Sequence, residues 1–178
     1  ALVGKWHLGY PPHFGPLKSG YEEHIGPLSG GVSYFSHLDR GGKVDLHENG
    51  EPVDHTGTYL TDLLSDRAAG YIQQRAADRQ PFLLSLHYSA PHWPWETRNQ
   101  PAVPAITGPT LAHLEGGNIH TYQQMIRELD EGIGRVLQAL EEGGLADDTL
   151  VVFTSDNGGE RFSDNWPLVG GKMDLTEG

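Results

Sequence analysis

Two short stretches of the sequence contain basic side chains that could bind an anion or move a proton. GKWHLG, at residues 4–9, places Lys5 two residues before His7. SAPHWPWE, at residues 89–96, places His92 in a rigid loop between two prolines. A lysine can hold an anion, and a histidine can carry a proton near neutral pH. Each stretch also allows a purely structural interpretation, in which the lysine extends to solvent and the histidines hydrogen-bond within the fold.

A third region combines oxygen ligands with a further lysine. TSDNGGERF, at residues 154–162, contains Asp156 and Asn157. Their carboxylate and amide oxygens suit Ca²⁺ or Mg²⁺ and suit zinc poorly. The alternative is an Asx turn followed by two glycines. GGKMDLTEG, at residues 170–178, then places Lys172 after two glycines that would let the backbone come close to a ligand.

The apolar pattern predicts an α/β fold that places these residues at the ends of strands. It indicates strands over residues 1–7, 81–88 and 149–158, helices over 58–78 and 118–142, a turn-rich loop over 9–31, and a hairpin over 32–50 that turns at residues 39–42. This order is typical of a mostly parallel sheet flanked by helices, in which ligands collect at the carboxyl ends of the strands. The three chemically unusual clusters follow the three predicted strands, so we expect an active site there.

Two further features have a choice of interpretation. Gly132 and Gly134 lie inside the second predicted helix, where glycine is unfavourable, so we expect close packing there. Trp93 and Trp95 flank Pro94 and could either pack in the core or form a platform for a sugar or aryl ring.

Composition limits the classes of partner. The chain has 178 residues, enough for one domain with a real core, and its formal net charge of −12 disfavours broad docking on nucleic acid or on an anionic membrane surface. No apolar run is long enough to span a bilayer. Cysteine is absent, so the chain offers neither a disulfide framework nor a thiolate nucleophile. An anionic substrate would therefore need a focused cationic pocket.

Taken together and in this order, GKWHLG, APHWP, SDNGG and GGK resemble the sulfatase family, specifically type I enzymes of the arylsulfatase A and N-acetylgalactosamine-6-sulfatase kind. The resemblance extends over essentially all 178 residues. It implies the alkaline-phosphatase-like sulfatase fold and hydrolysis of sulfate esters, particularly those of sulfated carbohydrates. It also implies a periplasmic, secreted or lysosomal location.

The same resemblance implies roles for the basic residues. Lys5 would contact the sulfate and the nucleophile, and His7 would hydrogen-bond the nucleophile. His92 would bind the sulfate and protonate the leaving alcohol. These roles agree with the chemistry, because sulfate ester hydrolysis builds negative charge on the leaving oxygen, which cations and a general acid stabilise.

The resemblance further implies a metal site and a nucleophile. Asp156 and Asn157 would bind Ca²⁺, with Mg²⁺ as the alternative, and Lys172 would be a second sulfate-binding lysine. The family's nucleophile is a formylglycine made in a C/S-x-P-x-R motif that precedes GKWHLG, and this motif is not in the chain. Val169 stands where many relatives have arginine. We therefore expect residues 1–178 to be the central part of one catalytic domain, without the nucleophile segment and the C-terminal subdomain, and expect the isolated chain to be inactive.

Two alternatives remain at the level of the sequence. One is a phosphatase or phosphodiesterase of the related superfamily, although those enzymes often have Asp-His where this chain has Asp156-Asn157. The other is a non-catalytic protein that binds sulfated glycans on the same fold.

Overall fold

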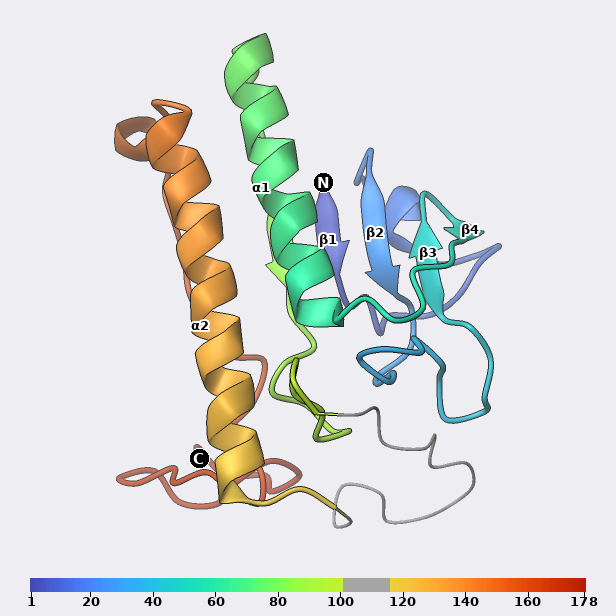
Figure 1. Ribbon diagram of the computed structural model, residues 1–178, viewed down its shortest axis with the longest axis vertical. Coiled ribbons are helices and arrows are strands. Elements are labelled where there is room, and N and C mark those ends of the chain that lie inside the picture. The colour runs from blue at the N-terminus through green and yellow to red at the C-terminus, as the bar shows by residue number, and fades with distance from the viewer. Residues whose placement is uncertain (101–115) are drawn as a thin grey trace.

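The computed structural model describes residues 1–100 and 116–178. Figure 1 shows a small sheet with two long helices beside it. The elements in chain order are β1 (Leu2–Gly4), the short 3₁₀ helix η1 (Pro16–Lys18), β2 (His24–Pro27), β3 (Leu46–Glu48), β4 (Glu51–Pro52), α1 (Leu60–Asp78), β5 (Ser85–His87), α2 (Ile119–Glu142) and η3 (Ala146–Asp148).

The sheet is mixed and has the strand order β4-β3-β2-β1-β5. Strand β1 lies parallel to both β2 and β5. Strand β3 is antiparallel to β2, and β4 is antiparallel to β3. The α/β fold predicted from the sequence is confirmed, with its parallel part confined to three strands. Because β1, β2 and β5 run in the same direction, the segments that follow them leave the sheet at one common edge.

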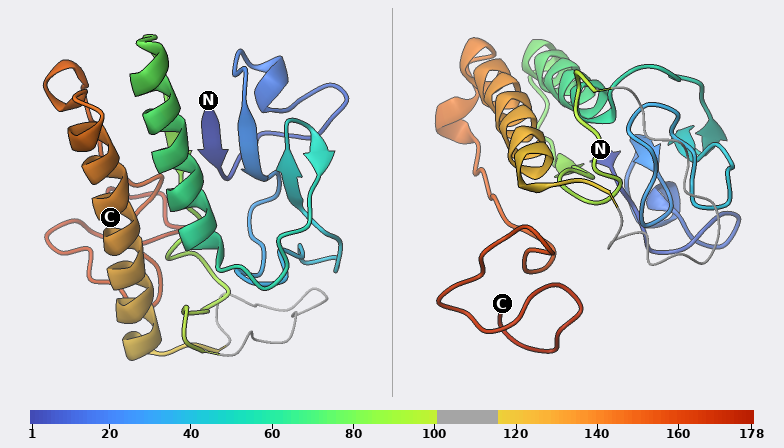
Figure 2. Two further views of the ribbon diagram at one scale, coloured as in Figure 1. Left: turned by 45° about the horizontal axis from the view of Figure 1, so that its top comes forward. Right: turned by 60° about the horizontal axis from the view of Figure 1, so that its bottom comes forward.

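Helix α1 forms as predicted, and its apolar face packs into the main core and, at Ile72, into a smaller core cluster with Ala139 and Leu140. The buried positions on this face recur at helical spacing and are Leu60, Leu63, Leu64, Ala68 and Ile72. The helix contacts β1 on one side and α2 on the other, so it lies between the sheet and α2 (Figures 1 and 2).

Helix α2 begins at an N-cap and meets α1 at a glycine. The Asn118 side chain accepts hydrogen bonds from the backbone N–H groups of His120 and Thr121, which satisfies two of the free donors at the helix start. A Cβ on Gly132 would lie under 3.0 Å from the hydroxyl of Ser65 on α1, so close packing is confirmed there. Apart from the helix's own backbone and the chain neighbours, no atom of the described residues lies within 4 Å of the same position on Gly134, where the expectation of close packing was wrong.

Residues 9–50 depart from the prediction in two places. The predicted loop contains η1 and the buried strand β2, whose sequence HIGP combines glycine and proline and so carries no strand signal. The turn at residues 39–42 is present and is flanked by an isolated bridge between Leu38 and Val44. However, the paired strands of the hairpin are β3 and β4, which turn at residues 49–50.

The strands predicted over residues 81–88 and 149–158 also differ from the structure. Strand β5 pairs with β1 as a parallel strand, but it is short and half-exposed because it forms the edge of the sheet. Residues 149–158 form no strand, and Leu150 is 89% exposed and Phe153 79% exposed. An apolar run becomes a buried strand only when another strand pairs with it, and no described strand does so here.

Candidate functional site

Lys5 leaves the sheet at the end of β1, where glycine is required. Its N–H donates to the carbonyl oxygen of His87 at 2.8 Å, and the His87 ring Nδ1 lies 3.1 Å from the carbonyl oxygen of Lys5. A Cβ on Gly4 would lie 2.5 Å from the carbonyl carbon of His87 and closer still to its oxygen. The first glycine of GKWHLG therefore lets β1 and β5 approach each other and fixes where Lys5 begins.

His7 is held by the extension of β2. The Trp6 N–H donates to the Pro27 carbonyl at 2.9 Å, and the His7 N–H donates to the Leu28 carbonyl at 3.1 Å. His7 has a φ of 56°, in the left-handed region that few non-glycine residues adopt. The chain bends sharply at this point, and the His7 side chain is exposed at the edge of the sheet.

A pair of glycines brings the two candidate histidines together. A Cβ on Gly30 would lie 2.5 Å from Cε1 of His7, and a Cβ on Gly31 would lie 3.1 Å from Cε1 of His92. The two rings therefore lie against consecutive residues of the segment that follows β2. Sequence reasoning missed these glycines, and the adjacent Gly-Gly pair after an apolar run was the signal available.

His92 is held in one tautomer and is neutral over most of the pH range. Its Nδ1 lies 2.5 Å from the carbonyl oxygen of Trp93, which can only accept, so Nδ1 carries the proton and Nε2 is the unprotonated nitrogen. Burial lowers the pKa of His92 to about 4, with a further lowering by the positive charges of Lys172 and Lys5.

Lys172 is anchored by its backbone and by an asparagine. Its N–H donates to the Gly159 carbonyl at 3.0 Å, and its Nζ lies 3.8 Å from a carboxylate oxygen of Glu160. The Asn165 side chain accepts from the Gly159 N–H at 2.9 Å and donates to the carbonyls of Gly159 at 3.2 Å and Gly170 at 3.0 Å. Asn165 thus ties the glycine pair after Asp156-Asn157 to the glycine pair before Lys172, and sequence reasoning missed it.

Electrostatic coupling shows that the sequence-predicted residues share one region. Burial lowers the pKa of Lys5. The negative charge of Asp156 raises this pKa, and the positive charge of Lys172 lowers it further. Burial also lowers the pKa of His7, and Lys5 and Lys172 lower it further. His92 is affected by the same three charges. The carboxyl edge of the sheet and the C-terminal segment therefore meet around two lysines and two histidines, with the carboxylates of Asp156 and Glu160 nearby.

Asp156 and Asn157 lie on an exposed loop. The Asn157 amide donates through Nδ2 to the Gly158 carbonyl at 2.7 Å. Their oxygens are of the type that Ca²⁺ prefers, but that ion takes about six to eight ligands. Among residues 1–100 and 116–178, no three acidic or histidine side chains form a group that could hold a metal ion. The two residues fit part of a hard-cation site.

The tryptophans do not form a ligand platform. Trp93 is 5% exposed and Trp95 is 4% exposed, so both rings belong to the core. The Arg40 guanidinium lies 5.0 Å from the centre of the Trp93 ring, and Trp95 packs edge-on against Tyr122 and Phe162. The packing interpretation is therefore correct.

The sequence model of the Sulfatase family matches residues 1–178, which is the whole chain. This chain belongs to the sulfatase family. The resemblance drawn from GKWHLG, APHWP and SDNGG is thereby confirmed, and the alkaline-phosphatase-like fold is the one shared by its structural neighbours.

The chain is similar to two curated proteins and one crystal structure as follows. N-acetylgalactosamine-6-sulfatase of Mus musculus is 31% identical over 196 aligned residues, which cover 99% of this chain and 35% of that protein. Arylsulfatase J of Mus musculus is 32% identical and covers 99% of this chain and 30% of that protein. The crystal structure of Ps i-CgsB in complex with k-i-k-neocarrahexaose aligns with a TM-score of 0.81 and 31% identity, covering 99% of this chain and 42% of that one.

The sulfatase chain spans about a third of the length of these curated relatives. None of the helices in the described part of the sulfatase chain is long and apolar enough to cross a membrane.

Proposed function

We propose that the protein carrying this chain hydrolyses sulfate esters of carbohydrates, and that residues 1–178 form the central part of its catalytic domain. The observation that carries the proposal is the cluster of Lys5, His7, His92 and Lys172 at the carboxyl edge of the sheet in a chain of net charge −12. The names of the relatives support the substrate class, because one acts on a sulfated amino sugar and another is bound to a neocarrahexaose.

The two lysines would bind the sulfate group. Lys5 is half-buried, and burial weakens its interaction with water, so its charge is available to an anion that replaces that water. Lys172 approaches the same region from the C-terminal segment. Preorganised cations of this kind stabilise the negative charge that the sulfuryl oxygens keep throughout the reaction.

His92 would act on the leaving oxygen through Nε2. Its proton-bearing Nδ1 is held by the Trp93 carbonyl, which leaves Nε2 as the atom that can receive a proton and pass it on. Its pKa of about 4 keeps the ring neutral in the free protein. A bound sulfate ester places a negative charge beside the ring and raises that pKa, so the acid form becomes available when substrate is present.

The nucleophile and the metal are inferred from what the sulfatase family generally uses. His7 would hydrogen-bond a formylglycine contributed by a segment outside residues 1–178. Asp156 and Asn157 would supply two oxygen ligands to Ca²⁺ or Mg²⁺, which when bound would offset the charge of the sulfate. We therefore expect no turnover of an aryl sulfate by residues 1–178 alone, because lysines and histidines can bind sulfate but offer no covalent route. From membership of the sulfatase family we also propose a periplasmic, secreted or lysosomal location.

The leaving-group dependence of His92→Ala tests this function in the complete enzyme. A sugar alcohol must be protonated as its S–O bond breaks, and general-acid help typically contributes about 10²–10⁴-fold. A nitrophenolate leaves without that help. We expect kcat on a sugar sulfate to fall about 100-fold or more, and kcat on a nitrophenyl sulfate to fall much less.

His120→Ala, at the exposed start of α2, is the matched control and should change neither rate. Equal losses on both substrates with a lowered melting temperature would show that His92 is structural. Faster turnover of an aryl phosphate than of an aryl sulfate by the wild type would favour the phosphatase alternative, against which the oxygen ligand of Asn157 argues. Binding of a sulfated glycan without turnover would favour the non-catalytic alternative.

A further inference from the structure

Tyr34 is hydrogen-bonded at both of its ends to the loop that carries His92, defined here as residues 89–98. Its hydroxyl donates to the carbonyl oxygen of His92 at 2.9 Å. Its backbone N–H donates to a carboxylate oxygen of Glu96 at 2.6 Å. Tyr34 is 1% exposed and stacks on Tyr59 with the ring centres 5.6 Å apart, so its own position is fixed by the core.

The hydroxyl of Tyr34 acts on the part of the backbone that aims the His92 ring. The His92 N–H donates to the Ser89 carbonyl at 2.8 Å, and the ring Nδ1 is held by the carbonyl of Trp93. The peptide group between His92 and Trp93 lies between these two contacts, and its carbonyl is the one that Tyr34 binds. Holding this peptide plane fixes the backbone torsions on both sides, and with them the direction of Nε2.

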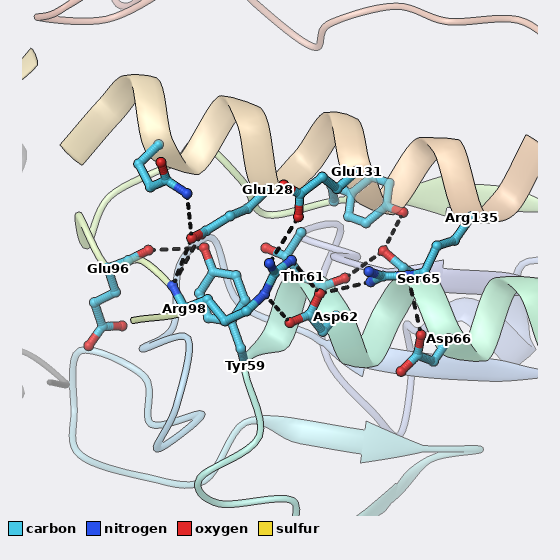
Figure 3. A network of polar contacts seen from close by, with 12 residues as sticks. Tyr59, Thr61, Asp62, Ser65, Asp66, Glu96, Arg98, Glu128, Glu131 and Arg135 are labelled. Carbon is cyan, nitrogen blue, oxygen red and sulfur yellow. Dashed lines mark hydrogen bonds and ion pairs between the residues drawn. The ribbon is translucent and has the colours of Figure 1, made fainter. Parts of the chain in front are cut away.

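The far end of the loop is held by a separate network that joins α1 and α2 (Figure 3). The Tyr59 hydroxyl donates to the Glu96 carbonyl at 3.0 Å. The Arg98 N–H donates to the buried carboxylate of Glu128, and the Arg98 guanidinium donates to Asp62 at 2.7 and 2.9 Å. These contacts hold the loop to the helices without touching the backbone of His92.

Tyr34 also links His92 to the glycine pair against which the two histidine rings lie. It lies three residues after Gly31, whose Cα faces the His92 ring. The segment that follows β2 therefore contacts His92 twice, at its ring through Gly31 and at its carbonyl through Tyr34. Glu96 is 1% exposed, and its carboxylate accepts the hydrogen bond from the Tyr34 backbone N–H. It therefore joins the segment that follows β2 to the loop that carries His92.

We propose that Tyr34 is a positioning residue for His92. The Tyr34 hydroxyl sets the direction of the His92 imidazole toward the leaving oxygen of the ester. This proposal rests on the proposed function of His92 as the general acid. Tyr34 is too deeply buried to contact a substrate itself. Its loss would leave the sulfate-binding lysines in place and would misalign the proton donor.

Tyr34→Phe and Tyr59→Phe form a matched pair of variants in the complete enzyme. Each removes one hydroxyl from a buried, stacked tyrosine that donates to a carbonyl of the same loop. We expect both variants to fold, and Tyr59→Phe to lose at least as much melting temperature as Tyr34→Phe, because the Tyr59 hydroxyl also interacts with the buried Glu128 carboxylate. Tyr34→Phe should lower kcat on a sugar sulfate about 10- to 100-fold, because small displacements of a catalytic group cost rates of that order. On a nitrophenyl sulfate its kcat should fall about threefold or less, with KM little changed on either substrate, since the lysines stay in place.

Tyr59→Phe should lower kcat about threefold or less on both substrates, because it frees the end of the loop that does not carry His92. Equal losses for the two variants, or equal losses of Tyr34→Phe on the two substrates, would overturn the proposal. If His92→Ala shows no preference between the substrates, the proposed function fails.

A second readout then decides the positioning role independently of activity. NMR of the His92 ring should show its pKa rising toward the ordinary value of 6.5 in Tyr34→Phe, because a loosened ring is less buried. The pKa of His92 should be unchanged in Tyr59→Phe. An unchanged pKa of His92 in Tyr34→Phe would overturn the positioning role whatever the rates are.

Discussion

Replacing Gly4 by alanine should separate β1 from β5 and displace Lys5. Gly4 has a φ of 120°, and an added Cβ would lie 2.5 Å from the carbonyl carbon of His87 and closer to its oxygen. That oxygen also accepts the hydrogen bond from the Lys5 N–H. Both atoms belong to the backbone of the neighbouring strand, so the clash can be relieved only by moving a strand.

The cost has two parts that a control variant can separate. Placing alanine at a positive φ costs about 1–2 kcal/mol, and overpacking against atoms that cannot yield costs about 1–3 kcal/mol more. Gly20 has a φ of 96°, and apart from its chain neighbours no atom of the described residues lies within 4 Å of its added Cβ, so Gly20→Ala shares only the first part. The lower entropy of an unfolded chain with alanine is common to both variants and cancels in the comparison.

Urea unfolding of the two variants at one pH measures the difference. We expect the free energy of unfolding to fall about 1–3 kcal/mol further in Gly4→Ala than in Gly20→Ala, with unchanged dependence on urea concentration. In the complete enzyme, sulfatase activity should also fall in Gly4→Ala and persist in Gly20→Ala. Equal destabilisation by the two substitutions would refute the conclusion that the first glycine of GKWHLG is required by the contact between strands.

Three further predictions concern the C-terminal segment, pH and metal binding. Asn165→Ala removes the hydrogen bonds that join the two glycine pairs, so KM for a sulfate ester should rise about tenfold with a smaller change in kcat; unchanged steady-state kinetics would contradict this. His24 and His92 each have a pKa lowered to about 4 in the fold, so the unfolded chain binds more protons between pH 4 and 6.5. The stability that these two histidines contribute should be constant above pH 6.5 and should decrease as pH falls toward 4. A melting temperature that does not decrease between pH 7 and pH 4.5 would count against it. Calorimetry on residues 1–178 should show no submicromolar Ca²⁺ binding, because Asp156 and Asn157 supply too few oxygens.

The sequence by itself determined the features that depend on neighbours along the chain. Helical spacing of apolar residues defined α1 and α2, because each helix buries one continuous face. The Lys-Trp-His and Pro-His-Trp-Pro stretches identified the sulfatase family. The α/β order then implied that Lys5 and His92 leave parallel strands at one edge, as they do.

Only the tertiary structure decided which distant residues meet and which strands find partners. Strand β2 has no alternating pattern and exists because β1 and β3 pair with it on both sides. The more strongly apolar run at residues 149–153 has no such partner among the described residues and stays exposed. Gly31 and Tyr34 contact His92 from about 60 positions away, and no periodicity encodes a contact of that range. Pairing and packing at long sequence separation depend on the whole fold, which is why the environment of His92 could not be derived from the motif that contains it.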